Sequence, residues 1–302
     1  MYKNEGWVMV KIILGLLLLL VAYFAFIYVP DVIKASKSEK IENKNFIAFG
    51  GIGFIANFFD TLGVGSFAII TSIVRFFKLT DDRTLPGTLN VSCTIPTALE
   101  AIIFLTVIKV DTLTLVSMIT AAVLGAIIGA DIVAKFNIRK VRIGMGLALI
   151  VVAILMLSGL LHLMPVGGTA DGLTGGKLII ALIANFVLGA LMQLGVGLYA
   201  PCMALIYALG MNPLAAFPIM MGSCAFLMPA GSAQFVKKGA YDRTASIAIT
   251  LFGSAGVLIA AYIVKSLPLD IVKWLVVVIV IYTSIMLLIS AHKVRKQVLE
   301  NA

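Results

Sequence analysis

Charged and imidazole side chains are scarce in this sequence, and their scarcity excludes most soluble folds and most enzymes. Only 12% of the 302 residues are charged, whereas soluble domains are about one quarter charged. The two histidines, His162 and His292, lie near the ends of apolar runs, so neither a Ser-His pair nor a His-ligated metal centre can form in the core. The phosphate-binding pattern GxxxxGK[ST] is also missing. We therefore expect no enzyme, no ATP-driven pump within this chain, no cofactor and no bound metal.

Cysteine is rare as well, and no thiol is placed for a disulfide framework or a CxxC metal site. Cys93, Cys202 and Cys224 all lie inside apolar runs, where cysteine usually packs as a small hydrophobic residue. The net charge of +9 comes from Lys and Arg in short stretches between apolar runs. This distribution is typical of membrane-topology signals and not of a nucleic-acid surface, so we expect no nucleic-acid partner.

Apolar residues are abundant instead, at 61% of the chain with a mean hydropathy of +1.11. Lipid must be the solvent for most of this surface. The first apolar run is too long for the core of a signal peptide, and no cleavage site of small residues follows it, so we interpret it as a transmembrane helix. Runs of about 20 residues or more predict an all-α polytopic membrane protein. The predicted apolar blocks are residues 8–29, 46–78, 85–108, 112–134, 140–162, 178–208, 213–236, 244–264 and 271–291.

Two of these blocks, 46–78 and 178–208, are longer than a crossing needs, and glycines interrupt both near the middle. The interruptions are Leu62-Gly63-Val64-Gly65 and Leu194-Gly195-Val196-Gly197. A straight helix of this length would need a steep tilt to fit the membrane. We predict instead that each block is a broken, re-entrant segment, which enters and leaves on the same side.

Basic residues, which favour cytoplasmic loops, test this interpretation. If both long blocks are re-entrant, the basic segments all fall on one side, at residues 30–45, 75–83, 135–142, 237–243 and 292–302. The basic-poor loops then fall on the other side, at residues 109–111, 163–177, 209–212 and 265–270. The prediction is seven crossings and two re-entrant segments, with the N-terminus outside and the C-terminus in the cytoplasm.

An internal repeat accompanies this topology. At an offset of about 132 residues the two Leu-Gly-Val-Gly tetrapeptides align, as do Pro86 and Pro218, and Ser92-Cys93 aligns with Ser223-Cys224 after a small shift. Each copy has one re-entrant segment and three crossings, an odd number, so the second copy is inverted, as in many secondary transporters. The expected divisions are an extra N-terminal helix and loop (1–45), the first inverted repeat (46–164), an extracytoplasmic linker (165–177), the second inverted repeat (178–291) and a cytoplasmic tail (292–302).

The broken segments carry the predicted binding site. A half-helix that starts at a break points free N–H groups and a partial positive charge into the protein, where they attract anions. The alternative is that the glycines only allow close helix packing, and that each polar residue satisfies a neighbouring group. The candidate substrate-binding residues are Gly63, Val64, Gly65, Ser66, Asn90, Ser92, Gly195, Val196, Gly197, Tyr199, Cys202, Ser223 and Cys224.

Two acidic residues, Asp60 and Glu100, lie deeper in the apolar blocks than the topology requires. A carboxyl group at membrane depth is costly, so each is a candidate for ion coupling, with a proton as the first ion to consider. Asp60 directly precedes the first break and has a second possible role, which is to cap the helix that follows.

The broken segments read LGVGSFAII (62–70) and LGVGLYAPCM (194–203), and each is followed by a proline-containing stretch, LPGTLNVSC (85–93) or FPIMMGSC (217–224). These motifs resemble the TauE/SafE family of sulfite exporter-like permeases over residues 46–291. The resemblance implies secondary transport of sulfite, of a sulfonate such as sulfoacetate, or of a related organosulfur anion across the bacterial inner membrane. Two departures bear on the substrate: the first motif has no counterpart of Pro201, and the Gly-Thr stretch is degraded in the second half.

The leading interpretation is therefore an exporter of a small sulfur-containing anion, coupled to an ion gradient, that works by alternating access around a midplane site. Its partners are the anion and the lipid bilayer, and a homo-oligomer stays open. One alternative is a membrane channel, or an importer of another small anion or a carboxylate. Another is a membrane interaction protein that transports nothing.

Overall fold

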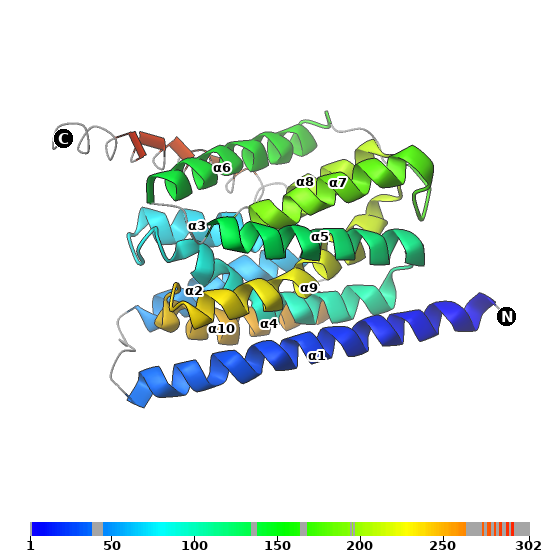
Figure 1. Cartoon of the computed structure of the whole chain (residues 1–302). Helices are drawn as coiled ribbons and strands as arrows, with labels where there is room; N and C mark the ends of the chain where they lie inside the picture. The colour runs from blue at the N-terminus through cyan, green and yellow to red at the C-terminus, as the bar shows by residue number, and fades with distance from the viewer. Residues whose placement is uncertain are drawn as a thin grey trace.

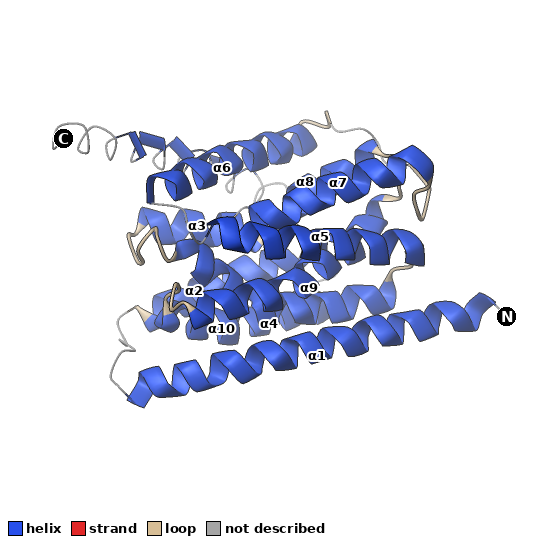
Figure 2. Cartoon of the chain, viewed as in Figure 1, coloured by secondary structure: helices blue, strands red, loops and turns tan. Residues whose placement is uncertain are grey.

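The computed structural model of the chain is a bundle of helices (Figures 1 and 2). It describes residues 2–37, 45–133, 138–163, 168–193, 195 and 197–263, with residues 274, 277, 278, 281, 284, 285, 288, 289, 291 and 292. Every regular element in these residues is helical, and 6 helices are long and apolar enough to cross a membrane. The predicted all-α polytopic class is thereby confirmed. Most of the last predicted block, 271–291, lies outside the described residues.

The helices follow the predicted apolar blocks closely. In chain order they are α1 (Tyr2–Lys37), α2 (Phe46–Thr61), α3 (Ser66–Phe76), α4 (Leu85–Val107), α5 (Thr112–Val133), α6 (Ile138–Leu160), α7 (Gly175–Met192), α8 (Tyr199–Ala208), the short 3-10 helix η1 (Pro213–Ala215), α9 (Ala216–Lys237) and α10 (Arg243–Ile263).

Helix α1 lies along one side of the bundle and is longer than the crossing predicted over residues 8–29 (Figure 1). One of its faces is buried against α4 and α9, where Phe24 and Tyr28 pack with Val91 and Phe235. The opposite face is apolar and exposed, with Phe26 at 81% exposure. A helix that is apolar on both faces fits a position between the protein and lipid.

Both over-long blocks are broken where the sequence predicted. The first break separates α2 from α3, and the second separates α7 from α8. The backbone φ angle is +87° at Gly63, +90° at Gly65 and +86° at Gly195. Only glycine adopts this left-handed region freely, so these residues let the chain leave one helix and start another in a few residues.

Three of the basic-poor loops meet at one end of the bundle. The N–H of Asp111 donates to the carbonyl of Asp171 at 2.8 Å, and the N–H of Asn212 donates to the carbonyl of Ala170 at 2.8 Å. The chain before α7 and the chain after α8 are therefore in direct contact. The fourth predicted loop of this group, 265–270, lies outside the described residues.

Basic segments meet at the other end. The hydroxyl of Thr80 donates to Asp242 at 2.9 Å, and Nε of Arg243 donates to Asp31 at 2.8 Å. These bonds join the chain after α3, the chain between α9 and α10, and the end of α1. Among the described residues, the basic segments that contain Asp31, Thr80 and Arg243 therefore lie together at this end.

Each broken segment packs against a helix from the other half of the chain. Helix α2 lies against α10, α7 lies against α5, and α4 and α9 pack together between them. Glycines allow the backbones to touch: a Cβ on Gly53 would lie 2.6 Å from Cα of Ile249, and one on Gly189 would lie 2.1 Å from the carbonyl oxygen of Ala122. Small residues commonly serve this purpose between membrane helices.

Candidate functional site

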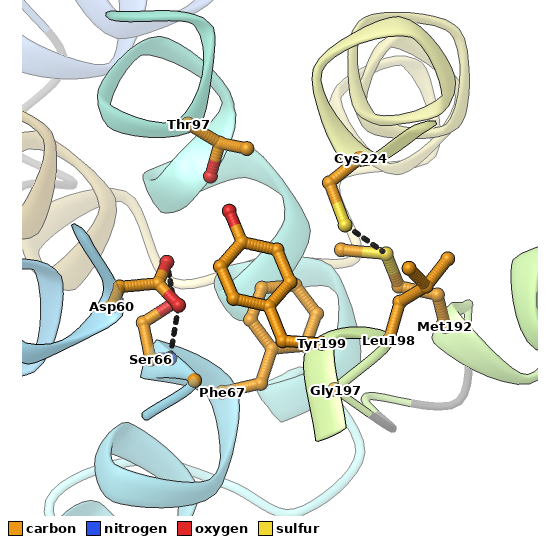
Figure 3. A pocket seen from close by; sticks show the side chains of 10 residues that line it. Asp60, Ser66, Phe67, Thr97, Met192, Gly197, Leu198, Tyr199 and Cys224 are labelled. Carbon is orange, nitrogen blue, oxygen red and sulfur yellow. Dashed lines mark hydrogen bonds between the residues drawn. The ribbon is translucent and has the colours of Figure 1, made fainter. Parts of the chain in front are cut away.

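The two breaks meet at a small pocket inside the bundle (Figure 3). Its free volume is about 10 Å³, roughly the space that one water molecule needs. Both halves of the chain contribute to the wall. The lining residues are Asp60, Gly65, Ser66, Phe67 and Thr97 from the first half, and Met192, Gly197, Leu198, Tyr199 and Cys224 from the second.

Asp60 and Ser66 close the first break on the pocket wall. The carboxylate of Asp60 accepts the N–H of Ser66 at Oδ1 and the hydroxyl of Ser66 at Oδ2, both at 2.7 Å. Ser66 is the first residue of α3, so Asp60 caps this helix at its positive end, where a negative charge is favourable. The turn through Gly63 and Gly65 folds the chain back and brings the two side chains together. The capping role expected as an alternative for Asp60 is the geometry that the structure has.

Glu100 lies behind the pocket on α4 and is completely buried. Its Oε1 forms a hydrogen bond of 2.9 Å with the hydroxyl of Thr61, and its Oε2 accepts the hydroxyl of Tyr199 at 2.7 Å. Thr61 is the last residue of α2, and Tyr199 is the first residue of α8. One carboxyl group is therefore bonded to both broken segments, one from each half. In the described part of the chain, no Lys, Arg or His forms an ion pair with Glu100.

Sulfur atoms form another part of the wall. The thiol of Cys224 donates to the sulfur of Met192 at 3.6 Å, and Figure 3 shows the ring of Tyr199 standing between this pair and Asp60. Cys93 and Cys202 are free and fully buried. Among the described residues, no group of three His, Cys, Asp or Glu side chains is arranged as a metal site.

The predicted residues on the pocket are Asp60, Gly65, Ser66, Gly197, Tyr199 and Cys224. Other candidates are engaged elsewhere. The amide nitrogen of Asn90 donates to its own helix and lies 3.4 Å from the carbonyl of Met192, where α7 ends. The hydroxyl of Ser92 bonds to the carbonyl of Leu89 in its own helix. These bonds lie within α4 and at the end of α7, and neither residue lines the pocket.

The remaining candidates form the surroundings of the pocket. Ser223 accepts a hydrogen bond of 3.0 Å from Asn185, which joins α9 to α7. A Cβ on Gly63 would lie 3.3 Å from the ring of Phe217, so this glycine also provides space for its neighbour. Val64, Gly195 and Cys202 are buried near the breaks without lining the pocket. Val196 lies outside the described residues.

Thr61, Phe67, Thr97, Met192 and Leu198 belong to the site but were not predicted from the sequence. A signal for Thr97 does exist. Cys93, Thr97 and Glu100 are spaced four and three residues apart, so they share one face of α4. Thr61 has no comparable signal, because its position against Glu100 depends on how α2 packs against α4. Phe67, Met192 and Leu198 were missed because apolar residues beside a break look like ordinary core.

Comparison with known proteins gives one match. The profile of the sulfite exporter TauE/SafE family matches residues 3–156. The match includes α1, which we had expected to lie outside the family resemblance. No curated protein matches the chain, and no solved structure does. Members of the matched family are membrane permeases and not enzymes. Because the match covers just over half of the sequence, the chain belongs to the sulfite exporter TauE/SafE family.

Proposed function

We propose that this protein is a secondary transporter that exports a small sulfur-containing anion, such as sulfite or a sulfonate like sulfoacetate, from the cytoplasm of a bacterium across its inner membrane. The observation that carries the proposal is the pocket between the two breaks, lined by both halves of the chain. Transporters commonly place the substrate where two repeats meet and where their helices are interrupted. Alternating access then requires only that the halves separate first on one side of the pocket and later on the other.

Two re-entrant segments in inverted repeats, residues 46–164 and 178–291, supply the moving parts in this proposal. The chain enters α7 and leaves α8 at the same end of the bundle, where Nζ of Lys177 donates to the carbonyl of Leu209 at 3.0 Å. The pairing of α2 with α10 and of α7 with α5 is the exchange expected if a two-fold axis relates the halves. The basic segments are placed in the cytoplasm by the positive-inside rule, which puts the N-terminus outside and the C-terminus inside.

Three hydroxyl groups, those of Ser66, Thr97 and Tyr199, reach the pocket wall. In the structure Ser66 donates to Asp60 and Tyr199 donates to Glu100, so an anion that uses either hydroxyl must replace one of these hydrogen bonds. Sulfite consists of a sulfur and three oxygen atoms, so it cannot fit in the space of one water molecule. Substrate binding therefore requires the pocket to widen. Tyr199 is the side chain best placed to move, because it begins α8 directly after the second break.

Counterflow in proteoliposomes tests the proposal. Vesicles containing the purified protein are loaded with sulfite, sulfoacetate, taurine or thiosulfate, and exchange with a labelled anion is measured over a range of concentrations. We expect saturable exchange of at least one organosulfur anion, and a large decrease in Ser66→Ala and Tyr199→Phe. Asp171→Asn, at an exposed loop position, is the matched control and should exchange normally. Non-saturable flux would indicate a channel, and no flux of any anion would contradict the proposal.

A further inference from the structure

The hydrogen bonds around Glu100 accommodate a proton on this carboxyl group. The hydroxyl oxygen of Thr61 lies 2.9 Å from Oε1 of Glu100 and 2.9 Å from the carbonyl oxygen of Asn57. A threonine hydroxyl has one hydrogen to donate, so it can serve only one of these two oxygens. If Glu100 is protonated at Oε1, its O–H donates to the hydroxyl oxygen of Thr61. The hydroxyl of Thr61 then donates to the carbonyl oxygen of Asn57. Oε2 then accepts the hydroxyl of Tyr199 at 2.7 Å, and every hydrogen has an acceptor.

Asp60 differs in one partner. Its Oδ1 faces the backbone N–H of Ser66, which can only donate, and its Oδ2 faces the hydroxyl of the same residue. It also lies at the positive end of α3, which stabilises a negative charge. The two buried carboxyl groups beside the pocket thus differ in charge: the hydrogen bonds favour an ionised Asp60 and a neutral Glu100.

Resting on the proposed transport function, we infer that Glu100 carries the one coupling proton of the transport cycle, and that Thr61 and Tyr199 link this proton to both broken segments. Glu100 is buried in this structure, so proton exchange requires the site to open; its carboxylate then takes H⁺ from water on one side of the membrane and forms an O–H bond. On release the same O–H bond breaks and H⁺ leaves to water on the other side. Asp60 keeps its charge throughout and serves as the cap of α3.

The surroundings of Glu100 support this assignment. The titratable groups near it are Asp60 at the end of α2, Tyr199 on α8, Cys224 on α9 and Cys93 on α4 itself. None of these is a cation. Helices α1, α3 and α10 also lie against α4. Of their charged residues, Asp31, Arg75 and Arg243 are paired at the end of the bundle, and Lys11, Lys34 and Lys37 are exposed. A fully buried carboxylate with only neutral donors and a second carboxylate nearby is strongly disfavoured, and a proton removes that cost.

The second half of the chain has no equivalent acid. At the offset of about 132 residues, Thr61 corresponds to Gln193 and Glu100 corresponds to Ser232. Gln193 is completely buried beside Gly231. Neither Gln193 nor Ser232 exchanges a proton in the neutral range. The asymmetry between the halves therefore leaves one proton site for each transport cycle.

The charge of the pocket determines how this proton is used. An anion that enters beside two ionised carboxylates would be repelled, so it binds more readily when Glu100 is neutral. The proton and the anion then move together, in the direction set by both gradients and by the membrane potential. A monoanion would move without net charge, whereas a dianion would carry one negative charge outward, which a negative interior favours.

Infrared spectroscopy tests the protonation of Glu100 without any transport assay. The purified protein at neutral pH should show the C=O stretching band of a buried, protonated carboxyl group. This band should disappear in Glu100→Gln and persist in Asp60→Asn, and the control Asp171→Asn should leave it unchanged. A wild-type protein without the band, or a Glu100→Gln variant that keeps it, would overturn the inference.

Simultaneous recording of proton and sulfite flux in proteoliposomes tests the coupling. We expect the wild type to move roughly one proton with each anion, and an imposed pH gradient to drive sulfite uptake. In Glu100→Gln, proton movement and pH-driven flux should be lost, whereas any flux that remains in Asp60→Asn should still carry protons. Tyr199→Phe and Thr61→Val should shift the pH dependence of flux, which a purely structural role would leave unchanged. Anion flux without proton movement in the wild type would refute the proton coupling but not the transport function. The absence of all flux would refute the proposed transport function. The infrared measurement would then still show whether Glu100 is protonated.

Discussion

Ser66 donates its backbone N–H and its side-chain hydroxyl to the same carboxylate, that of Asp60, each at 2.7 Å. Two short bonds from a single residue fix the angle between α2 and α3, since Asp60 belongs to the last turn of one helix and Ser66 begins the other. The side chain thereby replaces the backbone bonds that the glycine turn interrupts. This pair therefore helps to shape the part of the pocket wall that the first break forms.

Removal of the Asp60 carboxylate should destabilise the protein measurably. Asp60→Ala should lower the free energy of unfolding by about 1–2 kcal/mol, the usual effect of losing a helix cap. Ser66→Ala should have a smaller effect, of about 1 kcal/mol, because the N–H of residue 66 can still donate to Asp60. Thermal unfolding of the detergent-solubilised variants would measure both. Equal stability of Asp60→Ala and the wild type would show that the cap contributes nothing to the fold.

A second prediction concerns the contact between α5 and α7. A Cβ on Gly125 would lie 1.9 Å from the carbonyl oxygen of Phe186, so Gly125→Ala must push the two helices apart. We expect a loss of about 1–3 kcal/mol, as for other overpacked interiors. Gly51→Ala is the matched control, because no atom lies within 4 Å of a Cβ at this helical position. The stability of Gly51→Ala should be unchanged or higher, because alanine favours a helix more than glycine does. The difference in melting temperature between the two variants therefore reports the steric effect at Gly125 apart from the effect of helix propensity.

The sequence predicted the breaks because the signal for them is local. A glycine pair in the middle of an apolar block that is longer than a crossing indicates an interrupted helix, and Gly63, Gly65 and Gly195 do adopt left-handed angles. The contacts among three basic-poor loops, and those among three basic segments, agree with the distribution of Lys and Arg, which depends on the side of the membrane and not on how the helices pack. The membrane class followed from composition alone.

The contacts of Glu100 were beyond sequence reasoning. Tyr199 is 99 residues away in the sequence and comes from the other half of the chain. A helix pattern shows which residues of one helix share a face, but it does not show which helix that face meets. Asn90 and Ser92 show the opposite kind of error, because they were predicted for the site but do not line the pocket. Their hydrogen bonds are formed within their own helix and with the end of α7. Long-range packing decides which polar residues reach the pocket.

A third prediction concerns the attachment of α1. Arg243 binds Asp31 through Nε at 2.8 Å, and the hydroxyl of Tyr241 donates to the same carboxylate at 2.6 Å. Burial raises the pKa of Tyr241, and its bond to Asp31 raises it further, so this hydroxyl stays a donor through the neutral range. Asp31 and Arg243 are about one quarter exposed, and a double-mutant cycle with Asp31→Ala and Arg243→Ala should therefore give a coupling energy of only about 1 kcal/mol.

Salt provides the control for this pair. The coupling energy should fall at high ionic strength, because partly exposed charges are screened, whereas the smaller effect of Tyr241→Phe should not change with salt. A coupling energy of zero at low salt would show that the ion pair of Asp31 and Arg243 does not help to hold α1 in place.

A fourth prediction tests the re-entrant segments by the accessibility of introduced cysteines. All three native cysteines are buried, so a membrane-impermeant thiol reagent should label only a new, exposed thiol. Residues 170 and 208 lie just before α7 and at the end of α8, and residues 78 and 238 lie in the loops at the other end of the bundle; all four are exposed.

If α7 and α8 form one re-entrant segment, Ala170→Cys and Ala208→Cys must react from the same face of the membrane, and Lys78→Cys and Lys238→Cys from the opposite face. Labelling of intact cells and of inverted vesicles would distinguish the faces. If residues 178–208 instead cross the membrane once, positions 170 and 208 should react from opposite faces. These two positions therefore suffice to distinguish the two topologies. The positions in the basic loops, 78 and 238, then show which face is cytoplasmic.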